Sequence, residues 1–317
     1  MTKKPLIIIS GATAVGKTDL SIALAEKING EIISADSMQV YKGFDIGTAK
    51  ISESEMHGIR HWLIDELEPE EEFNVYEFKT RAVKYINDIL SRGKIPIIVG
   101  GTGFYIQSVL YDVDFTETDS DRSYRQQLEE INAENGPEYL HEMLKKIDPD
   151  SAAAIHANNT KRVIRALEYY HDTGSPISVH NREQHQRESC YNSAYIVLNR
   201  SREVIYDRIN RRVDLMIESG LENEVRDLLK GGVPEDSLAM QGLGYKEMIS
   251  YINGRADFNE TVSIIKQSTR HFAKRQLTWF RREKDVIWMD YKDFADNSQM
   301  LSHIINILKE KKIVQIS

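Results

Sequence analysis

The sequence predicts an α/β protein in which a doubly wound parallel sheet carries a helical insertion. Strand and helix patterns alternate over the first hundred residues, and strand patterns then disappear between about Thr116 and Tyr195. A glycine-rich loop joins the first strand to the first helix. Ligands of such sheets bind beyond the carboxyl ends of the strands, so we expect the functional site at that edge.

The first hundred residues contain three strands and two helices by their apolar patterns. Leu6–Ile9 is a short apolar run typical of a buried parallel strand, and a helix over Asp19–Ile28 follows it. A second strand is expected at Glu31–Ala35, a helix at Phe78–Ser91 and a third strand at Ile95–Val99. This order favours right-handed crossovers and parallel strands.

The middle of the chain is helical in pattern. Helices are expected at Tyr124–Asn135, Pro137–Ile147 and Lys161–His171, with Pro137 at a start and Gly174 after an end. We expect a core domain of residues 1–115 and 200–317 and a helical insertion of 116–199, with the sheet resuming at Tyr195–Leu198.

The last third returns to the sheet domain. Two amphipathic helices are expected, one with Ile209 and Val213 on its apolar face and the next with Leu221 and Val225. A long helix over Asn259–Arg282 and a short strand over Val286–Met289 complete the expected elements.

Composition limits the class of protein. The chain has 317 residues, 41% hydrophobic and 28% charged, which is ordinary for a globular protein. Its single cysteine, Cys190, excludes an internal disulfide and a cysteine-rich zinc site and fits a reducing cytoplasm. No apolar run is long enough for a membrane span, and no signal peptide is expected before the first strand. The net charge of −8 argues against nonspecific nucleic-acid binding but permits a local basic surface.

The loop after the first strand is a complete phosphate-binding motif. Its residues Gly11-Ala12-Thr13-Ala14-Val15-Gly16-Lys17-Thr18 match G-x-x-x-x-G-K-[ST] between a strand and a helix, which predicts a P-loop (kinase-like) fold. Lys17 would contact the outer phosphates of a di- or triphosphate, and Thr18 offers a hydroxyl to Mg²⁺. The motif does not identify the phosphate compound or show that phosphoryl transfer is the reaction.

Two further strand ends carry polar groups. Asp36 follows the second strand, where it either caps a turn or serves as a general base or a water-mediated Mg²⁺ ligand. Thr102 follows the third strand within a glycine-rich turn, where its hydroxyl could contact a substrate. The polar segment 41–50 is expected to be a surface loop.

Basic segments suggest an RNA surface. Arg162 and Arg165 share a helix face, although such a face is often only solvated. Segment 270–282 mixes Lys and Arg with aromatic residues and has no acidic one, so it suits RNA binding unless the aromatic residues form the core face. An arginine cluster at Arg208, Arg211 and Arg212 could stabilise a leaving diphosphate, without a sign of which arginine does so.

These motifs together resemble the tRNA dimethylallyltransferases, also called tRNA isopentenyltransferases. The family pattern is matched in order by Gly11–Thr18, Asp36–Tyr41, Asp45–Lys50, Val99–Thr102, Arg162–Glu168, Gly244-Tyr245 and Lys274–Gln276. Ala12 and Val15 depart from the pattern, because bacterial members usually have Pro and Ser there.

The resemblance implies transfer of dimethylallyl from dimethylallyl diphosphate to N6 of adenosine 37 in tRNAs that read codons beginning with U, in a cytoplasmic, Mg²⁺-dependent, monomeric enzyme. It implies catalytic roles for Asp36 as general base, Thr102, Lys17 and Arg212, and diphosphate binding by the loop. By the same resemblance the tRNA anticodon stem-loop would contact Asp36, Ser37, Met38, Gln39, Thr102, Arg125, Lys161, Arg162, Val163, Ile164, Arg165, Gln241, Gly242, Leu243, Gly244, Tyr245 and Lys246.

Two other functions remain open from the residues. A small-molecule kinase of the same fold would use the same phosphate loop, although the insertion and the basic aromatic segment would then lack a clear purpose. A noncatalytic RNA-binding protein with a vestigial loop would not need Lys17, Thr18, Asp36 and Thr102 together.

Overall fold

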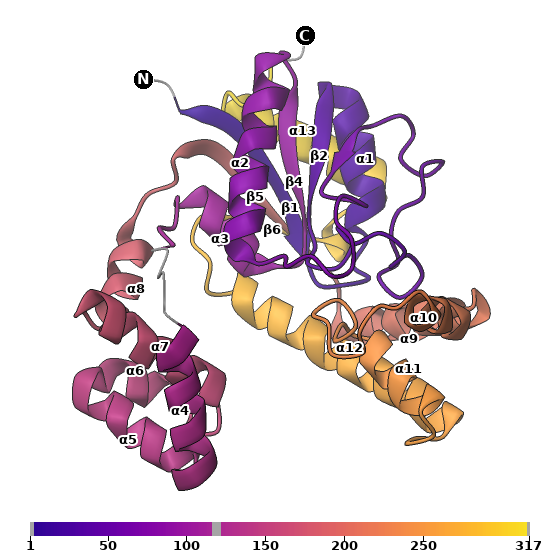
Figure 1. Ribbon diagram of the computed structural model, residues 1–317. Coiled ribbons are helices and arrows are strands. Elements are labelled where there is room, and N and C mark those ends of the chain that lie inside the picture. The colour runs from indigo at the N-terminus through magenta and orange to yellow at the C-terminus, as the bar shows by residue number, and fades with distance from the viewer. Residues whose placement is uncertain (1–2, 116–121, 316–317) are drawn as a thin grey trace. The chain divides into compact units, whose positions relative to one another are not determined.

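The computed structural model describes residues 3–115 and 122–315 (Figure 1). In chain order the elements are β1 Lys4–Gly11, α1 Lys17–Ile28, β2 Gly30–Ala35, β3 His61–Trp62, α2 Val75–Ser91, β4 Ile95–Gly100, α3 Gly103–Leu110, α4 Arg122–Asn135, α5 Pro137–Ile147, α6 Pro149–Ala154, α7 Thr160–Thr173, α8 Ile177–Gln186, β5 Tyr191–Asn199, α9 Arg202–Glu218, α10 Leu221–Lys230, α11 Tyr245–Ile252, α12 Phe258–Phe280, β6 Val286–Asp290, a 3₁₀ turn at Tyr291–Asp293 and α13 Asn297–Glu310.

The sheet confirms the predicted parallel fold. Its strand order is β3-β2-β4-β1-β5-β6, and every pairing is parallel. The register aligns the ends of three strands, because Gly100 pairs with Ser10 on one side and with Ala35 on the other. The phosphate loop, Asp36 and Thr102 therefore begin at the same edge, as the sequence predicts.

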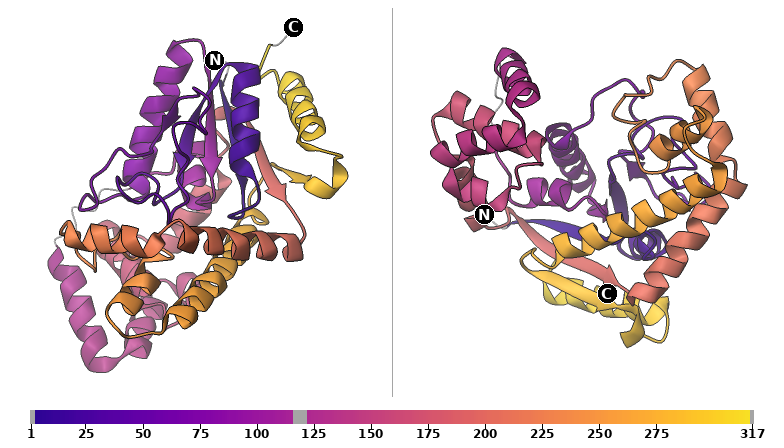
Figure 2. Two further views of the ribbon diagram at one scale, coloured as in Figure 1. Left: turned by 90° about the vertical axis from the view of Figure 1, so that its right-hand side faces the viewer. Right: turned by 90° about the horizontal axis from the view of Figure 1, so that it is seen from below.

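Helices cover both faces of the sheet. The left view of Figure 2 shows α2 on one face and α1 with α13 on the other. Strand β1 is buried on both faces, so its apolar run needs no polar alternation. One face packs Leu20 and Leu24 of α1 and Ile304 of α13 against the strands, and all three side chains are almost fully buried.

A layer of helices crosses the carboxyl ends of the strands. Figure 1 shows α12 running below these ends, with α9, α10 and α11 on the same side, and the right view of Figure 2 shows the same crossing from below. Ser201 caps α9, because its hydroxyl accepts a hydrogen bond from Val204 N–H, and Asp257 caps α12 by accepting from two N–H groups. These helices bring residues from the last third of the chain to the phosphate loop.

The chain divides into two compact units, residues 1–110 with 189–317 and residues 111–188. These bounds differ from the expected insertion of 116–199, because β5 starts at Tyr191 and is hydrogen-bonded along β1. The second unit has its own apolar core, which includes Leu128, Leu140, Leu144 and Val163 from α4, α5 and α7.

The apolar patterns of the sequence did not predict several elements, most of them short. Helices α3, α6, α8, α11 and α13 and the two-residue strand β3 have no counterpart among the expected elements. Helix α13 starts at an Asp296 cap rather than at a strong change in apolar pattern. Helix α2 starts three residues before the expected Phe78, because Asn74 accepts hydrogen bonds from two N–H groups of its first turn. Among the described residues, none of the helices has the length and apolar character that a bilayer span requires.

Candidate active site

The phosphate loop has the backbone geometry that its sequence predicts. Gly11 has φ +141° and leaves no room for a side chain, since a Cβ there would lie 2.6 Å from the carbonyl oxygen of Leu198. Gly16 has φ +109° and caps α1 without a side-chain hydrogen bond to the first N–H groups of the helix. The amino end of α1 is therefore open toward the loop, as an anion site requires.

Basic and hydroxyl groups hold the carbonyl oxygens of the loop. Arg208 Nε donates to Ala14 O at 2.6 Å, and Arg200 Nε donates to Val15 O at 3.0 Å. Tyr291 donates its hydroxyl to Gly16 O at 3.2 Å, and its ring lies 3.3 Å from the Arg200 guanidinium carbon. These hydrogen bonds occupy loop carbonyl oxygens, which would otherwise repel an anion. The two arginines also place positive charge around the loop.

Lys17 and Arg212 form the cationic centre of the site. Lys17 Nζ donates to Gly11 O and Ala12 O at 3.1 and 2.9 Å. Burial and, next, the Arg212 guanidinium lower the pKa of Lys17 to about 8, against the opposing effect of Asp36. Burial also lowers the pKa of Arg212. A buried ammonium whose charge is disfavoured by burial and by a neighbouring guanidinium favours a bound anion.

The arginine cluster separates into three roles. Arg208 holds Ala14 O, and Arg212 Nη2 donates to Thr48 O at 3.1 Å. Arg211 instead pairs with Asp207 at 3.1 Å on the same helix, and its side chain is 77% exposed. Arg212, unlike Arg211, therefore bonds the 41–50 loop, and its charge interacts with those of Lys17 and Asp36.

Asp36 both caps a turn and presents a free oxygen. Its Oδ1 accepts hydrogen bonds from Met38 N–H at 2.9 Å and Gln39 N–H at 3.3 Å. Its Oδ2 accepts none from any residue in the described ranges, and the side chain is only half-buried. The two interpretations of Asp36 are therefore compatible: one oxygen shapes the turn, and the other is available to a substrate.

Thr102 sits in a turn that α12 supports. Thr102 N–H donates to Ala35 O at 3.2 Å, which links the β4 end to the β2 end. Gln276 of α12 donates from Nε2 to Gly101 O at 3.0 Å and accepts from Thr13 N–H at 2.9 Å. Gln276 is 7% exposed and so joins the Thr102 turn directly to the phosphate loop.

The two residues that depart from the family loop are buried in apolar clusters. Val15 is fully buried in the core under α1, and Ala12 is fully buried against Ile205, Ile209 and Ala273. Apolar side chains fit these positions, and the loop shape is maintained by its backbone contacts.

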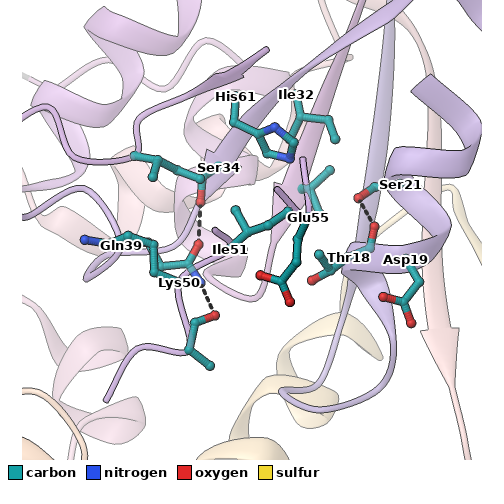
Figure 3. Close-up of a pocket in the computed structure, with 13 residues that line it drawn as sticks. Thr18, Asp19, Ser21, Ile32, Ser34, Gln39, Lys50, Ile51, Glu55 and His61 are labelled. Atoms are coloured by element: carbon teal, nitrogen blue, oxygen red, sulfur yellow. Dashed lines mark hydrogen bonds between the residues drawn. The ribbon is translucent and has the colours of Figure 1, made fainter. Parts of the chain in front are cut away.

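Segment 41–50 is a loop, as expected, and side-chain hydrogen bonds hold its backbone. Gln39 Nε2 donates to Thr48 O at 3.3 Å, and Lys50 Nζ donates to Tyr41 O at 2.7 Å and to Asp45. The loop lines a cavity of about 300 Å³ that reaches Thr18. Figure 3 shows Gln39 and Thr18 on opposite sides of this cavity, with Glu55 between them.

The oxygen groups at the loop fit a magnesium ion that is shared with phosphate. Thr18 is exposed at the start of α1, and its hydroxyl has no hydrogen-bond partner within the described ranges. Over those ranges no group of three or more His, Cys, Asp or Glu side chains could hold a metal on its own. Mg²⁺ typically takes one or two protein oxygens together with phosphate oxygens and water, which matches this donor set.

The expected RNA contacts of the first unit are partly brought together. Gly242 lies against Met38, since a Cβ on Gly242 would be 2.6 Å from Met38 Cε. Gln241 and Lys246 are exposed, whereas Tyr245 is fully buried and donates its hydroxyl to Glu224 at 2.6 Å. The Tyr245 side chain is therefore committed to the protein interior.

In the second unit, only some of the expected RNA contacts reach the surface. Lys161 and Arg162 are exposed on α7, and Arg165 is half-buried. Val163 and Ile164 are buried in the core of the unit, so their side chains support the helix. Arg125 uses Nε and Nη2 in a bidentate pair with Glu168 at 2.8 and 2.7 Å.

The basic aromatic segment of α12 has both a core face and a basic surface. Phe280 and Gln276 are buried, while Lys274, Arg275 and Arg281 are exposed. The aromatic residue Phe280 thus contributes to the core, and the basic residues form a surface. Part of this surface, Lys274 and Arg281 with Arg202, surrounds a cavity of about 250 Å³ that has Tyr206 and Leu277 in its wall.

Several residues at the site were not singled out by the sequence. Arg200, Tyr291 and Glu224 lie in ordinary helical or turn contexts, and no local pattern distinguishes them. Gln276 lies within the Lys274–Gln276 motif of the family pattern, but no sequence pattern assigned it a role at the phosphate loop.

Comparison with known proteins agrees with this arrangement. A family model described as IPP transferase matches residues 39–283. A tRNA dimethylallyltransferase of Lachnoclostridium phytofermentans is 56% identical, covering 98% of this chain and 100% of the relative. One of Bacillus cereus is 50% identical over 98% of this chain and 97% of its own length.

Solved structures agree as well. A tRNA isopentenylpyrophosphate transferase of Bacillus halodurans is 44% identical, with a TM-score of 0.73 over 98% of each chain. A eukaryotic dimethylallyltransferase described as acting on tRNA is 31% identical, with a TM-score of 0.83 over 97% of this chain and 80% of that one. The family model, the curated relatives and the solved structures agree, and the chain belongs to the IPP transferase family.

Proposed function

We propose that the chain transfers the dimethylallyl group of dimethylallyl diphosphate to N6 of adenosine 37 in tRNAs that read codons beginning with U. The products are N6-isopentenyladenosine and diphosphate. The observation that carries this proposal is the placement of Asp36, whose Oδ2 accepts no hydrogen bond from the described residues, at the strand end that the sheet register aligns with the phosphate loop. A base beside an anion site suits a reaction in which an amine replaces a diphosphate.

The phosphate loop binds the leaving group. The C1–O bond of the donor breaks as N6 attacks C1, so negative charge grows on the diphosphate. Lys17 and Arg212 stabilise that charge, and the open amino end of α1 adds N–H groups. Thr18 would offer its hydroxyl to Mg²⁺, which would supply further charge neutralisation.

Asp36 supplies the base. The N6 lone pair is delocalised into the adenine ring, so attack is favoured when the amine proton leaves at the same time. Oδ2 of Asp36 takes that proton, while Oδ1 keeps the carboxylate in place through two N–H groups. Thr102, in the adjacent turn, contacts the target nucleotide.

The adenosine must leave the anticodon-loop stack to reach these groups, which costs a few kcal/mol. Exposed cations on α7 and α12, among them Lys161, Arg162 and Lys274, offset that cost through phosphate contacts. Exposed cations on each of the two units agree with tRNA binding in a chain whose overall charge is negative. A tRNA substrate also fits a cytoplasmic protein.

The test is incubation with unmodified tRNA containing A36-A37-A38, labelled dimethylallyl diphosphate and Mg²⁺. Label is expected on the tRNA, and a matched tRNA with G37 should remain unlabelled. Absence of label on the A37 tRNA contradicts the proposal. Transfer of phosphate from labelled ATP to a small acceptor would identify a kinase instead.

A further inference from the structure

The carboxylate of Glu224 is enclosed by donors from a loop far away in the sequence. Oε2 accepts from Asp45 N–H at 3.0 Å and Ile46 N–H at 2.6 Å, and Oε1 accepts from Gly47 N–H at 3.1 Å. Successive backbone N–H groups that converge on one anion form a nest. Here the anion is a side chain of α10, so the loop is wrapped around a built-in carboxylate.

Tyr245 adds a further donor to Glu224, and we call these two residues the clamp. Its hydroxyl donates to Oε1 of Glu224 at 2.6 Å, and its ring lies 4.8 Å from that of Phe44. Gly47 rests on the same ring, since a Cβ there would be 2.5 Å from Tyr245 Cε2. Tyr245 is fully buried. The loop therefore cannot shift on its support without breaking hydrogen bonds to Glu224.

The clamped loop ends in a contact with the active site. Thr48 follows Gly47 directly, and its carbonyl oxygen accepts from Arg212 Nη2 at 3.1 Å. Over the described residues, this is the one hydrogen bond of the Arg212 side chain. The position of the guanidinium thus depends on the position of Thr48 O, which depends on the clamp.

We propose that Glu224 and Tyr245 are positioning residues for Arg212, acting through the Asp45–Thr48 loop. This inference rests on the proposed function, in which Arg212 stabilises the departing diphosphate. The clamp aims the guanidinium in advance, so that no reorganisation is needed when charge develops. It also explains why the motif Asp45–Lys50, which has no catalytic group in the site, accompanies the phosphate loop.

The main test is the E224Q variant. Glutamine keeps the size of the side chain but replaces one acceptor oxygen by an NH₂ group that faces N–H donors. We expect kcat for dimethylallyl transfer to fall about 10- to 100-fold, because a small misplacement of a stabilising group has effects of that order. KM for tRNA should stay within about twofold of wild type.

The control is E222Q, on the same helix. Glu222 forms a partly exposed ion pair with Arg226 at 2.8 Å and, among the described residues, accepts no hydrogen bond from the loop. E222Q should keep wild-type kcat. Y245F removes only the hydroxyl, so it should lower kcat by less than E224Q does. If E224Q does not fold, as judged by circular dichroism, the milder Y245F decides the proposal in its place.

A double-mutant cycle separates positioning from general support. If Glu224 acts through Arg212, R212A/E224Q is no slower than R212A alone. A wild-type kcat in E224Q would overturn the proposal, and so would losses of kcat that multiply in R212A/E224Q. When Y245F replaces E224Q, the same two outcomes in Y245F and R212A/Y245F would overturn it. The same cycle is run on binding of inorganic diphosphate by calorimetry. That readout does not need transfer, so failure of the proposed function, seen as an inactive wild type, is distinguishable from failure of this inference.

Discussion

Asp36 divides two tasks between its two oxygens. Oδ1 accepts hydrogen bonds from the N–H groups of Met38 and Gln39, and Oδ2 has no protein donor in the described ranges. Capping of the turn and the proposed role as base therefore use different oxygens of one side chain. The sequence left capping and catalysis as alternatives; the structure confirms the cap and leaves Oδ2 available for the proposed catalytic role.

Asp36→Asn separates the two tasks. The asparagine Oδ1 can still cap the turn, so the free energy of unfolding should change little, whereas transfer should fall by about 10²- to 10⁴-fold without a base. Asp36→Ala should lose transfer and also about 1 kcal/mol of stability. Both should retain diphosphate binding, measured by calorimetry. Wild-type turnover in the asparagine variant would remove Asp36 from the role of base.

Lys17 gives the site a pH dependence with a defined direction. Its pKa is about 8, so the ammonium is charged below that pH and is lost above it. The affinity for diphosphate should therefore decrease as the pH rises through about 8, measured by calorimetry between pH 6.5 and 9.5. Because Arg212 lowers this pKa, R212A should move the inflection to higher pH. An unchanged inflection in R212A would show that the two cations are not coupled.

At the scale of elements, Gln276 joins helix α12 to two strand ends. It accepts from Thr13 N–H and donates to Gly101 O, so one side chain maintains the spacing between the phosphate loop and the Thr102 turn. Gly101 has to be glycine for this contact, because a Cβ there would lie 2.0 Å from Gln276 Nε2. The close approach of α12 and β4 is thus built from a pair of residues far apart in the chain.

Gly101→Ala should force these elements apart. The clash should cost about 1–3 kcal/mol in the free energy of unfolding, measured with urea, and should weaken diphosphate binding. Gln276→Ala makes room for the added methyl group, so the double variant should be no less stable than Gln276→Ala alone. Additive losses would mean that the alanine at position 101 is strained by something other than Gln276.

The whole molecule consists of two units with separate cores. The sheet unit carries the phosphate loop and Asp36, and residues 111–188 pack around Leu128, Leu140 and Leu144. Lys161 and Arg162 lie on the surface of the second unit. Separate cores permit one unit to be weakened while the other stays intact.

Leu144→Ala tests this independence. Leu144 is fully buried, so its truncation should destabilise the helical unit by about 2–5 kcal/mol. Hydrogen exchange should accelerate within 122–188, while exchange in β1 and β4 and the affinity for diphosphate should not change. The tRNA affinity should decrease. Faster exchange throughout the sheet would instead indicate one cooperative unit.

The sequence by itself determined the parallel fold, the phosphate loop and the presence of Asp36 and Thr102 at neighbouring strand ends. Each of these depends on residues within one strand and the turn that follows, where local pattern and glycine positions decide the conformation. The exact limits of the second unit were harder to predict from the sequence, because the full extent of β5 is defined by its pairing with β1.

The resemblance pointed to Arg212, but only the tertiary structure shows how Arg208, Arg211 and Arg212 differ in their contacts. Arg212 meets Thr48 O across 164 positions, and Glu224 meets the same loop across 177 to 179. Such contacts depend on how α9 and α10 pack beneath the strands, and no local propensity encodes that packing. The chemistry was therefore readable from short motifs, while its alignment came from long-range packing.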